Sequence, residues 1–136
     1  MASTVRDPYP LTPWSRTVLA LLGAECAAIA LSLWVRPPDA VGRTSATVAD
    51  FIPVLGVAWP WLFLTVALLL FATAAIAWNR WLHVVLSFGA GVHASYGLNS
   101  LAVSVLNRTG WVAGALALAV ALFYLASAIR LTRGQR

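Results

Sequence analysis

Three ionisable side chains lie inside or at the edge of long apolar stretches of this sequence: Glu25, His83 and His93. Ionisable residues at membrane depth usually face other helices or water, and an acid beside an imidazole can share or exchange a proton. His83 lies two residues after Trp81, so we place it at a membrane interface. Glu25, within LALLGAECAAIAL, and His93 are therefore the candidates for chemistry.

Glu25 and His93 occupy matching positions in their apolar stretches. Glu25 follows Trp14 by 11 residues, and His93 follows Trp81 by 12. Because an α-helix rises about 1.5 Å per residue, helices that start at the same side of a bilayer bring both side chains to nearly the same depth. We expect the two to pair if their helices touch. Such a pair suits either a structural contact that fixes which helices meet or a proton-linked pathway.

Other chemistry has little support. The sequence has no nucleophile elbow, HExxH motif, Gly-rich phosphate loop or pair of carboxylates, so we expect no enzymatic activity. Cys26 is the single cysteine, which excludes an intramolecular disulfide and a CxxC site, and we interpret it as a small buried helix residue. We expect no metal and no cofactor, since His83 lies about 15 Å along the same helix from His93.

The elements that must position these residues are apolar. Of the 136 residues, 61% are hydrophobic and only 10% are charged, whereas soluble domains carry about 25% charged residues. The hydrocarbon of a lipid bilayer is the solvent that suits such a chain. All nine basic residues are Arg and fall between apolar runs, which argues against nucleic-acid binding. We expect one domain, residues 1–136.

Four apolar stretches predict four transmembrane helices, at about residues 14–34, 59–78, 81–106 and 111–129. Each is close to the roughly 20 residues that cross a bilayer, where only a helix satisfies its own backbone. Indole prefers the headgroup boundary, and every tryptophan lies at or near a predicted helix end. These expected interfacial anchors are Trp14, Trp34, Trp59, Trp61, Trp78, Trp81 and Trp111. The predicted fold is an all-α integral membrane bundle of four helices.

The arginines set the expected orientation. Four spans place both termini on one side, together with Arg6, Arg16, Arg80, Arg130, Arg133 and Arg136. The other side holds Arg36, Arg43 and Arg108. Because basic residues concentrate in cytoplasmic segments, we expect both termini in the cytoplasm of a multi-pass cell-membrane protein. A cleaved signal peptide is the alternative for the first helix, but its long apolar run favours a retained helix.

The long outer loop, about residues 35–58, leaves one boundary open. Pro60 suits the first turn of a helix, where its missing N–H costs nothing, and this favours a second helix that starts near Trp59. Residues 51–58 would then lie along the outer interface or between helices. In the alternative, the second helix starts near Ile52 and kinks at Pro60.

The third predicted helix carries a polar and small-residue stripe. Its members recur at spacings of three and four: Gly89, His93, Tyr96, Gly97, Ser100, Ser104 and Asn107. On the first predicted helix, Ser32 shares a face with Glu25. We expect a buried polar seam between these two helices, formed by Glu25, Ser32, His93, Tyr96 and Ser100. Ordinary packing of small residues explains the stripe equally well.

One helix carries a family resemblance. The lone glutamate halfway along the first of four short helices, in Ala24–Glu25 within LLGAECAA, resembles the small multidrug resistance transporters. The resemblance covers about one helix and implies a proton- or cation-linked site at Glu25. The chain departs from that family in its long first outer loop, its arginine bias and its histidine-bearing third helix.

Three functions remain as hypotheses. Small size and the lack of a catalytic motif favour a non-catalytic accessory or assembly subunit of a larger membrane complex. The alternative that the resemblance implies is an oligomeric proton- or cation-linked carrier or channel. The third is a phage-type pore-forming lysis protein, a holin, suggested by a few short spans and an arginine-bearing tail. The expected partners are the lipid bilayer and other membrane subunits or further copies of this chain, and not nucleic acid.

Overall fold

A computed structural model describes residues 11–35, 53–76, 81–107 and 112–133. These residues form four α-helices and no strand: α1 (Pro13–Val35), α4 (Pro53–Ile76), α5 (Leu82–Asn107) and α6 (Val112–Arg133). Two of them are long and apolar enough to cross a membrane, judged by length and composition, over Pro13–Val35 and Ala58–Ile76. Gly114–Arg130 is a shorter apolar helical segment.

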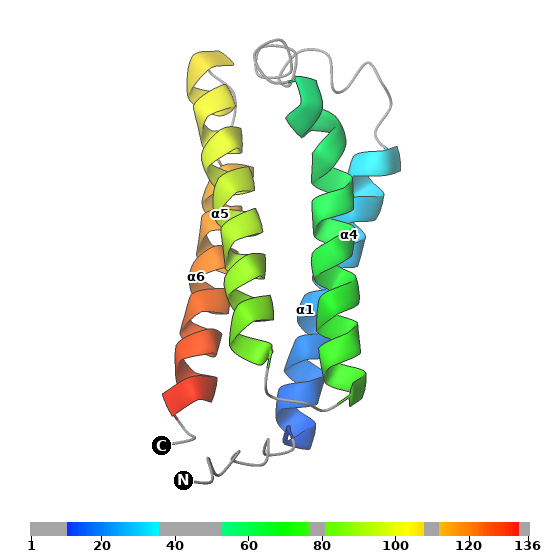
Figure 1. Cartoon of the computed structure of the whole chain (residues 1–136). Helices are drawn as coiled ribbons and strands as arrows, with labels where there is room; N and C mark the ends of the chain where they lie inside the picture. Colours follow the sequence, from blue (N-terminus) through cyan, green and yellow to red (C-terminus); the bar gives the residue numbers. More distant parts are fainter. Residues whose placement is uncertain (1–10, 36–52, 77–80, 108–111, 134–136) are drawn as a thin grey trace, which may run out of the picture.

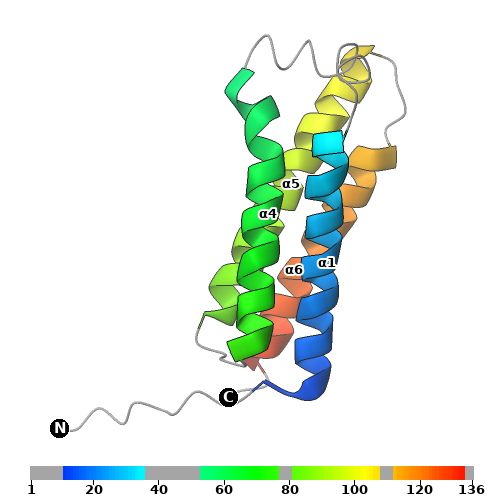
Figure 2. The same cartoon turned by 90° about the vertical axis from the view of Figure 1, so that its right-hand side faces the viewer.

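The four helices run antiparallel to their neighbours along the chain, side by side in one bundle (Figures 1 and 2). The start of α1, the end of α4, the start of α5 and the end of α6 lie at the same end of this bundle. The closest packing is between α1 and α4 and between α5 and α6, and α4 also packs against α5. The bundle is therefore built from two helix pairs.

The start of α1 is fixed by local hydrogen bonds. The Thr12 hydroxyl accepts a hydrogen bond from the backbone N–H of Ser15 at 3.2 Å, which is the N-cap arrangement. Pro13 follows as the first helical residue, where a missing N–H costs nothing. At the same end of the bundle, Arg16 Nε donates to the carbonyl oxygen of Ala74 at 2.8 Å. Arg16 thereby satisfies one of the last carbonyls of α4, which have no partner within that helix.

The bounds of α1 and α5 agree with the predicted helices to within one residue at both ends. The start of α6 agrees as well, but its end lies four residues later than expected. The second helix differs. α4 begins at Pro53, well before the expected start near Trp59, and Pro60 lies inside it. The structure therefore agrees with the alternative in its early start, and Pro60 lies within one continuous helix. Neighbouring helices can satisfy the carbonyl that an internal proline leaves free, so a proline is tolerated inside such a helix. The prediction that Pro60 marks the first turn therefore placed the start of α4 too late.

The tryptophans divide into two groups. Trp14, Trp34, Trp61 and Trp81 are between 46% and 75% exposed, and the Trp34 and Trp61 rings meet edge to face at 5.2 Å. Trp59 does not fit the expectation of an interfacial anchor, because it is buried and its ring packs against that of Tyr96. The side of α4 on which each indole lies explains this difference, since Trp59 faces Tyr96 of α5, whereas Trp61, two residues further along, is exposed. Trp78 and Trp111 lie outside the described residues.

Candidate functional site

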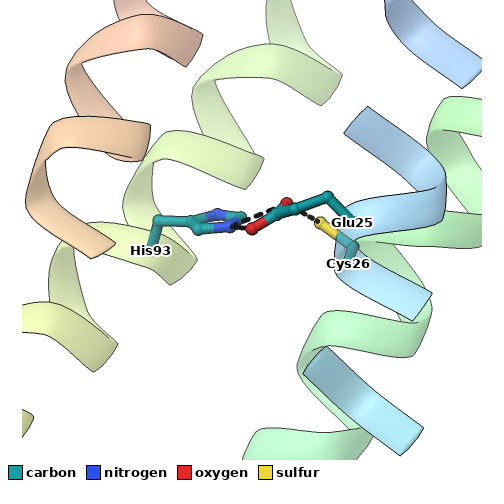
Figure 3. Close-up of side chains that lie close together, drawn as sticks. All are labelled: Glu25, Cys26 and His93. Atoms are coloured by element: carbon teal, nitrogen blue, oxygen red, sulfur yellow. Dashed lines mark hydrogen bonds and ion pairs between the residues drawn. The ribbon is translucent and has the colours of Figure 1, made fainter. Parts of the chain in front are cut away.

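Four polar side chains from three helices meet at one level of the bundle. We call Glu25, Cys26, His93 and Tyr124 the central cluster. Glu25 and Cys26 come from α1, His93 from α5 and Tyr124 from α6. Each lies near the middle of its helix; Glu25, for example, is 12 residues after the first residue of α1 and 10 before the last. Figure 3 shows the Glu25 side chain reaching from α1 toward the His93 ring, with Cys26 beside it.

His93 is the centre of this cluster and is only 1% exposed. Its Nε2 lies 3.2 Å from Glu25 Oε1 and 3.3 Å from Glu25 Oε2. Its Nδ1 lies 2.9 Å from the carbonyl oxygen of Gly89, one turn earlier in α5. A carbonyl oxygen only accepts hydrogen bonds, so Nδ1 must carry a proton and Nε2 is the nitrogen that faces Glu25.

This arrangement leaves two protonation states for the pair. Either a neutral imidazole accepts a hydrogen bond from a protonated Glu25, or an imidazolium donates to a Glu25 carboxylate. Both states hold one proton between Glu25 and His93, and both have no net charge. The pair can therefore stay neutral in an apolar interior while its shared proton moves between the two side chains.

Aromatic rings from the other helices enclose the imidazole. Phe63 of α4 meets the His93 ring edge to face, with centroids 5.1 Å apart. The Tyr124 ring lies 4.9 Å away at a tilt of 33°. With Glu25 from α1, every helix of the bundle contributes a neighbour to His93. The rings hold the imidazole in one orientation and leave its Nε2 directed at α1.

Cys26 and Tyr124 extend the hydrogen bonds to a second side of Glu25. Cys26 Sγ lies 3.5 Å from Glu25 Oε2, to which the thiol donates, and 3.2 Å from the Tyr124 hydroxyl. The Tyr124 hydroxyl also lies 3.5 Å from the carbonyl oxygen of Leu22. Both residues are fully buried. A continuous series of polar atoms therefore runs from α6 through α1 to α5.

Glu25 is the member of the cluster that reaches the outside. Its side chain is 34% exposed, although its partner His93 is 1% exposed. Ala24 and Ala28, its neighbours on α1, are exposed, as are Leu21 and Leu31 on the same side of the helix. The carboxyl group thus lies at the border between the bundle interior and an apolar outer face.

The structure brings together only part of the expected seam. Glu25 and His93 are in contact, but Ser32 is exposed and its hydroxyl donates to the carbonyl oxygen of Ile29 at 2.8 Å. Tyr96 is half-buried and packs with its ring 5.4 Å from those of Trp59 and Phe63 on α4. Ser100 is half-buried and lies seven residues beyond His93, which is roughly 10 Å along the helix.

The glycines of the stripe face α6 and not α1. A Cβ atom placed on Gly89 would lie 2.4 Å from the Tyr124 ring, and one on Gly97 would lie 3.0 Å from the carbonyl oxygen of Gly114. The stripe of α5 is therefore shared among three neighbouring helices. These two glycines therefore do not lie in a seam between the first and third predicted helices.

Cys26 and Tyr124 are members of the cluster that the sequence analysis did not place there. For Tyr124, counting must start from the end of α6, because α6 runs opposite to α1: Tyr124 lies nine residues before Arg133, whereas Glu25 lies 12 after Pro13. The predicted end of this helix at residue 129 placed Tyr124 too close to the end of the helix for that comparison to reveal it. For Cys26 the signal is its position next to Glu25. That signal does not show which side of the helix faces the bundle.

The cluster also contains three types of metal-ligating atom. A carboxylate oxygen of Glu25, the Sγ of Cys26 and a ring nitrogen of His93 all lie within 4.8 Å of one another. The arrangement can therefore share a proton, as an acid–imidazole pair, or offer a mixed donor set to an ion.

Comparisons with known proteins add no relative. No protein-family model matches the sequence, and no significant match is found among curated proteins or solved structures.

Proposed function

We propose that this protein is an integral membrane subunit whose four helices each span the bilayer, with both termini in the cytoplasm, and which acts without catalysis inside a larger membrane assembly. The exposed carboxyl group of Glu25 at mid-height carries the proposal of an assembly. The apolar outer surface, the tryptophans and the arginines support the membrane topology.

The outer surface of the bundle is as apolar as its core. Each helix exposes a large aliphatic side chain in its middle region: Leu21, Leu68, Leu98 and Leu122 are between 60% and 67% exposed. The exposed hydroxyls of Thr17, Ser32 and Thr65 each donate to a backbone carbonyl oxygen of their own helix, at 2.8–3.1 Å. Such a surface suits hydrocarbon, since contiguous apolar area of this kind is rare on soluble monomers.

The exposed indoles fit the two boundaries of a bilayer. Trp14 and Trp34 lie at opposite ends of α1, 20 residues apart, a rise of about 30 Å, which equals the thickness of the hydrocarbon layer. Arg16 and Arg130 lie near the start of α1 and the end of α6, at one end of the bundle. Six of the nine arginines belong to that side in the proposed topology, and the positive-inside rule makes it cytoplasmic.

Glu25 supports a partner for α1. A carboxyl group is costly when it faces hydrocarbon and normally faces protein or water. The Glu25 side chain is 34% exposed at the middle of α1. Only 22% of the apolar span of α1 is buried, whereas 44% of the apolar span of α4 is buried. A second protein surface over Ala24, Glu25 and Ala28 removes this cost. The partner is another membrane subunit or a further copy of this chain.

Photo-crosslinking in native membranes tests this proposal. A photoreactive phenylalanine analogue replaces Ala28, one turn from Glu25 on the exposed side of α1, and a control replaces Leu122 on the exposed side of α6. We expect a protein adduct at position 28 and mainly lipid adducts at position 122. The mass of the adduct distinguishes a second copy from a different subunit. A position 28 that yields only lipid adducts, at normal expression, contradicts the proposal.

The Glu25–His93 pair favours a second candidate, a proton-linked carrier or channel. The proton shared by Glu25 and His93, and the partly exposed Glu25 side chain, are the features that such a pathway needs. Vesicles containing the protein and a pH-sensitive dye test it: a carrier shows proton flux that Glu25→Gln abolishes and His83→Gln leaves intact. Abrupt growth arrest on overproduction, unchanged by Glu25→Gln, would instead support a holin.

A further inference from the structure

The central cluster has the donors, spacing and charge of a metal site. We propose that Glu25, Cys26 and His93 bind one divalent transition-metal ion, with zinc the best match to the donor set. This site is independent of the proposed assembly, since all three donors belong to one chain. It differs from the expectation from the sequence, which assigned no metal to the protein.

The donor types select the class of ion. A thiolate, an imidazole and a carboxylate together are typical ligands of zinc, whereas calcium and magnesium prefer oxygen donors alone. Sites with three protein ligands leave a fourth position open for water or another ligand. The partly exposed Glu25 side chain places that position at the border of the bundle interior.

The separations of the donor atoms fit a tetrahedral ion. An ion about 2.0–2.1 Å from nitrogen and oxygen and about 2.3 Å from sulfur places its ligand atoms about 3.3–3.6 Å apart. Glu25 Oε2 lies 3.3 Å from His93 Nε2 and 3.5 Å from Cys26 Sγ. The third distance, between His93 Nε2 and Cys26 Sγ, is at most 4.8 Å. We expect a rotation of side chains, rather than a helix movement, to shorten it when an ion binds.

The surrounding residues already hold the ligands as a metal site requires. Histidine ligands usually donate their second ring N–H to a carbonyl or carboxylate, and His93 Nδ1 does so to Gly89 at 2.9 Å. That bond leaves Nε2 as the ligand atom. The Tyr124 hydroxyl, 3.2 Å from Cys26 Sγ, is placed to donate a hydrogen bond to a metal-bound thiolate.

Charge balance suits an apolar interior. A divalent ion with one thiolate, one carboxylate and one neutral imidazole has no net charge. On binding, the ion takes the place of two protons, one from the Cys26 thiol and one shared by Glu25 and His93. No other charged side chain is needed in the cluster, and the neighbour that α4 supplies to His93 is the apolar ring of Phe63.

Cobalt binding to the purified chain tests the site. The protein is prepared in detergent without a histidine tag, stripped with a chelator and titrated with Co²⁺, whose absorption reports tetrahedral geometry in the visible range and thiolate ligation in the near ultraviolet. We expect one Co²⁺ per chain, displaced by Zn²⁺ and not by Mg²⁺. The absence of a thiolate band in the unaltered protein overturns the proposal without any variant.

Variants then assign the ligands. Cys26→Ser should abolish the thiolate band, and His93→Gln and Glu25→Gln should each weaken binding by more than the roughly 10- to 100-fold effect typical of outer-shell changes. Tyr124→Phe should weaken binding about 10-fold and keep the stoichiometry. His83→Gln is the matched control, because His83 is an exposed histidine of the same helix outside the cluster. Helix content and elution volume of each variant show that it has folded. Unchanged binding in folded His93→Gln, or its loss in His83→Gln, contradicts the site.

Discussion

The two helix pairs of this bundle pack in different ways. In the α5–α6 pair the backbones come close, since a Cβ atom on Gly114 would lie 2.6 Å from Leu101 Cγ and 2.9 Å from the Gly97 carbonyl oxygen. In the α1–α4 pair a Cβ atom on Gly23 would meet only the edge of the Phe71 ring, at 3.0 Å. At these glycines, backbone meets backbone in the α5–α6 pair, whereas the glycine of the α1–α4 pair meets an aromatic side chain.

The central cluster lies where the two pairs meet. The α5–α6 pair supplies His93 and Tyr124, whose rings are 4.9 Å apart, and the α1–α4 pair supplies Glu25 and Cys26. The α5–α6 pair thus holds the imidazole, and the α1–α4 pair brings the carboxyl group to it. The cluster is thus one of the contacts that join the two pairs, together with the packing of Tyr96 of α5 against Trp59 and Phe63 of α4, while the glycines lie within the α5–α6 contact.

The largest expected effect is in the α5–α6 pair. Gly114→Ala places a methyl group against the Gly97 carbonyl oxygen and the Leu101 side chain, and the backbones must separate. We expect a loss of about 1–3 kcal/mol in the free energy of unfolding, the usual cost of overpacking. Denaturant titration in detergent, followed by circular dichroism, measures it. Gly91→Ala is the control, because nothing lies within 4 Å of its added Cβ. Equal stability of the two variants contradicts the close-backbone description.

The next effect concerns the junction between the pairs. A double-mutant cycle with Glu25→Gln and His93→Gln should give a coupling energy near about 0.6 kcal/mol, and not above about 1.7 kcal/mol, the range found for hydrogen bonds between membrane-spanning helices. The cycle isolates the pair from the separate costs of each change. Denaturant titration of the four proteins measures it. Additive effects would show that Glu25 and His93 do not interact in the folded protein.

A smaller effect is expected within the α1–α4 pair. Gly23→Ala requires the Phe71 ring to move by a few tenths of an ångström, and α1 gains up to about 1 kcal/mol from the helix preference of alanine over glycine. We expect these terms to offset each other and leave stability within about 0.5 kcal/mol of the original. Thermal unfolding of Gly23→Ala and Gly114→Ala, measured side by side, tests this contrast between the two pairs. A loss as large as that of Gly114→Ala would remove the difference between the pairs.

The smallest effect is expected at the end of the α1–α4 pair. Arg16→Gln removes the 2.8 Å hydrogen bond from Arg16 Nε to the Ala74 carbonyl oxygen. The side chain is exposed, so we expect a loss of about 0.5 kcal/mol, the low end for one hydrogen bond. Hydrogen exchange should speed up at the last turn of α4 and stay unchanged in α5 and α6. Faster exchange across all four helices would show that Arg16 also acts on the junction between the pairs.

The sequence predicted the helices better than their contacts. Long apolar runs located α1, α5 and α6, because length and hydropathy depend on local composition alone. The start of α4 was misplaced because Pro60 is compatible with both a first turn and an interior position. Counting residues brought Glu25 and His93 to one height, since the rise of a helix is constant. The rotation of each helix about its axis decides which side faces which neighbour.

That rotation explains the remaining differences. Gly89 and Gly97 share a face of α5 with His93, yet they contact α6 while His93 reaches α1. A long glutamate side chain makes this possible, since it crosses a gap that the backbones of α1 and α5 do not close. Trp59 and Tyr124 are buried for the same reason: tertiary packing, not the polarity of the residue, determines which face turns inward.

The distance of Glu25 from its partner along the chain, 68 residues, has a consequence for biogenesis. A ribosome adds about 5–20 residues per second, so Glu25 is synthesised roughly 3–14 s before His93. In the proposed topology, the first hairpin can therefore reach the lipid before the imidazole partner of Glu25 is in place, and only the Cys26 thiol of the same helix is then at hand to bond to the carboxyl group. Insertion of the second hairpin is what completes the protein, and a chain truncated after the first should be removed by quality-control proteases.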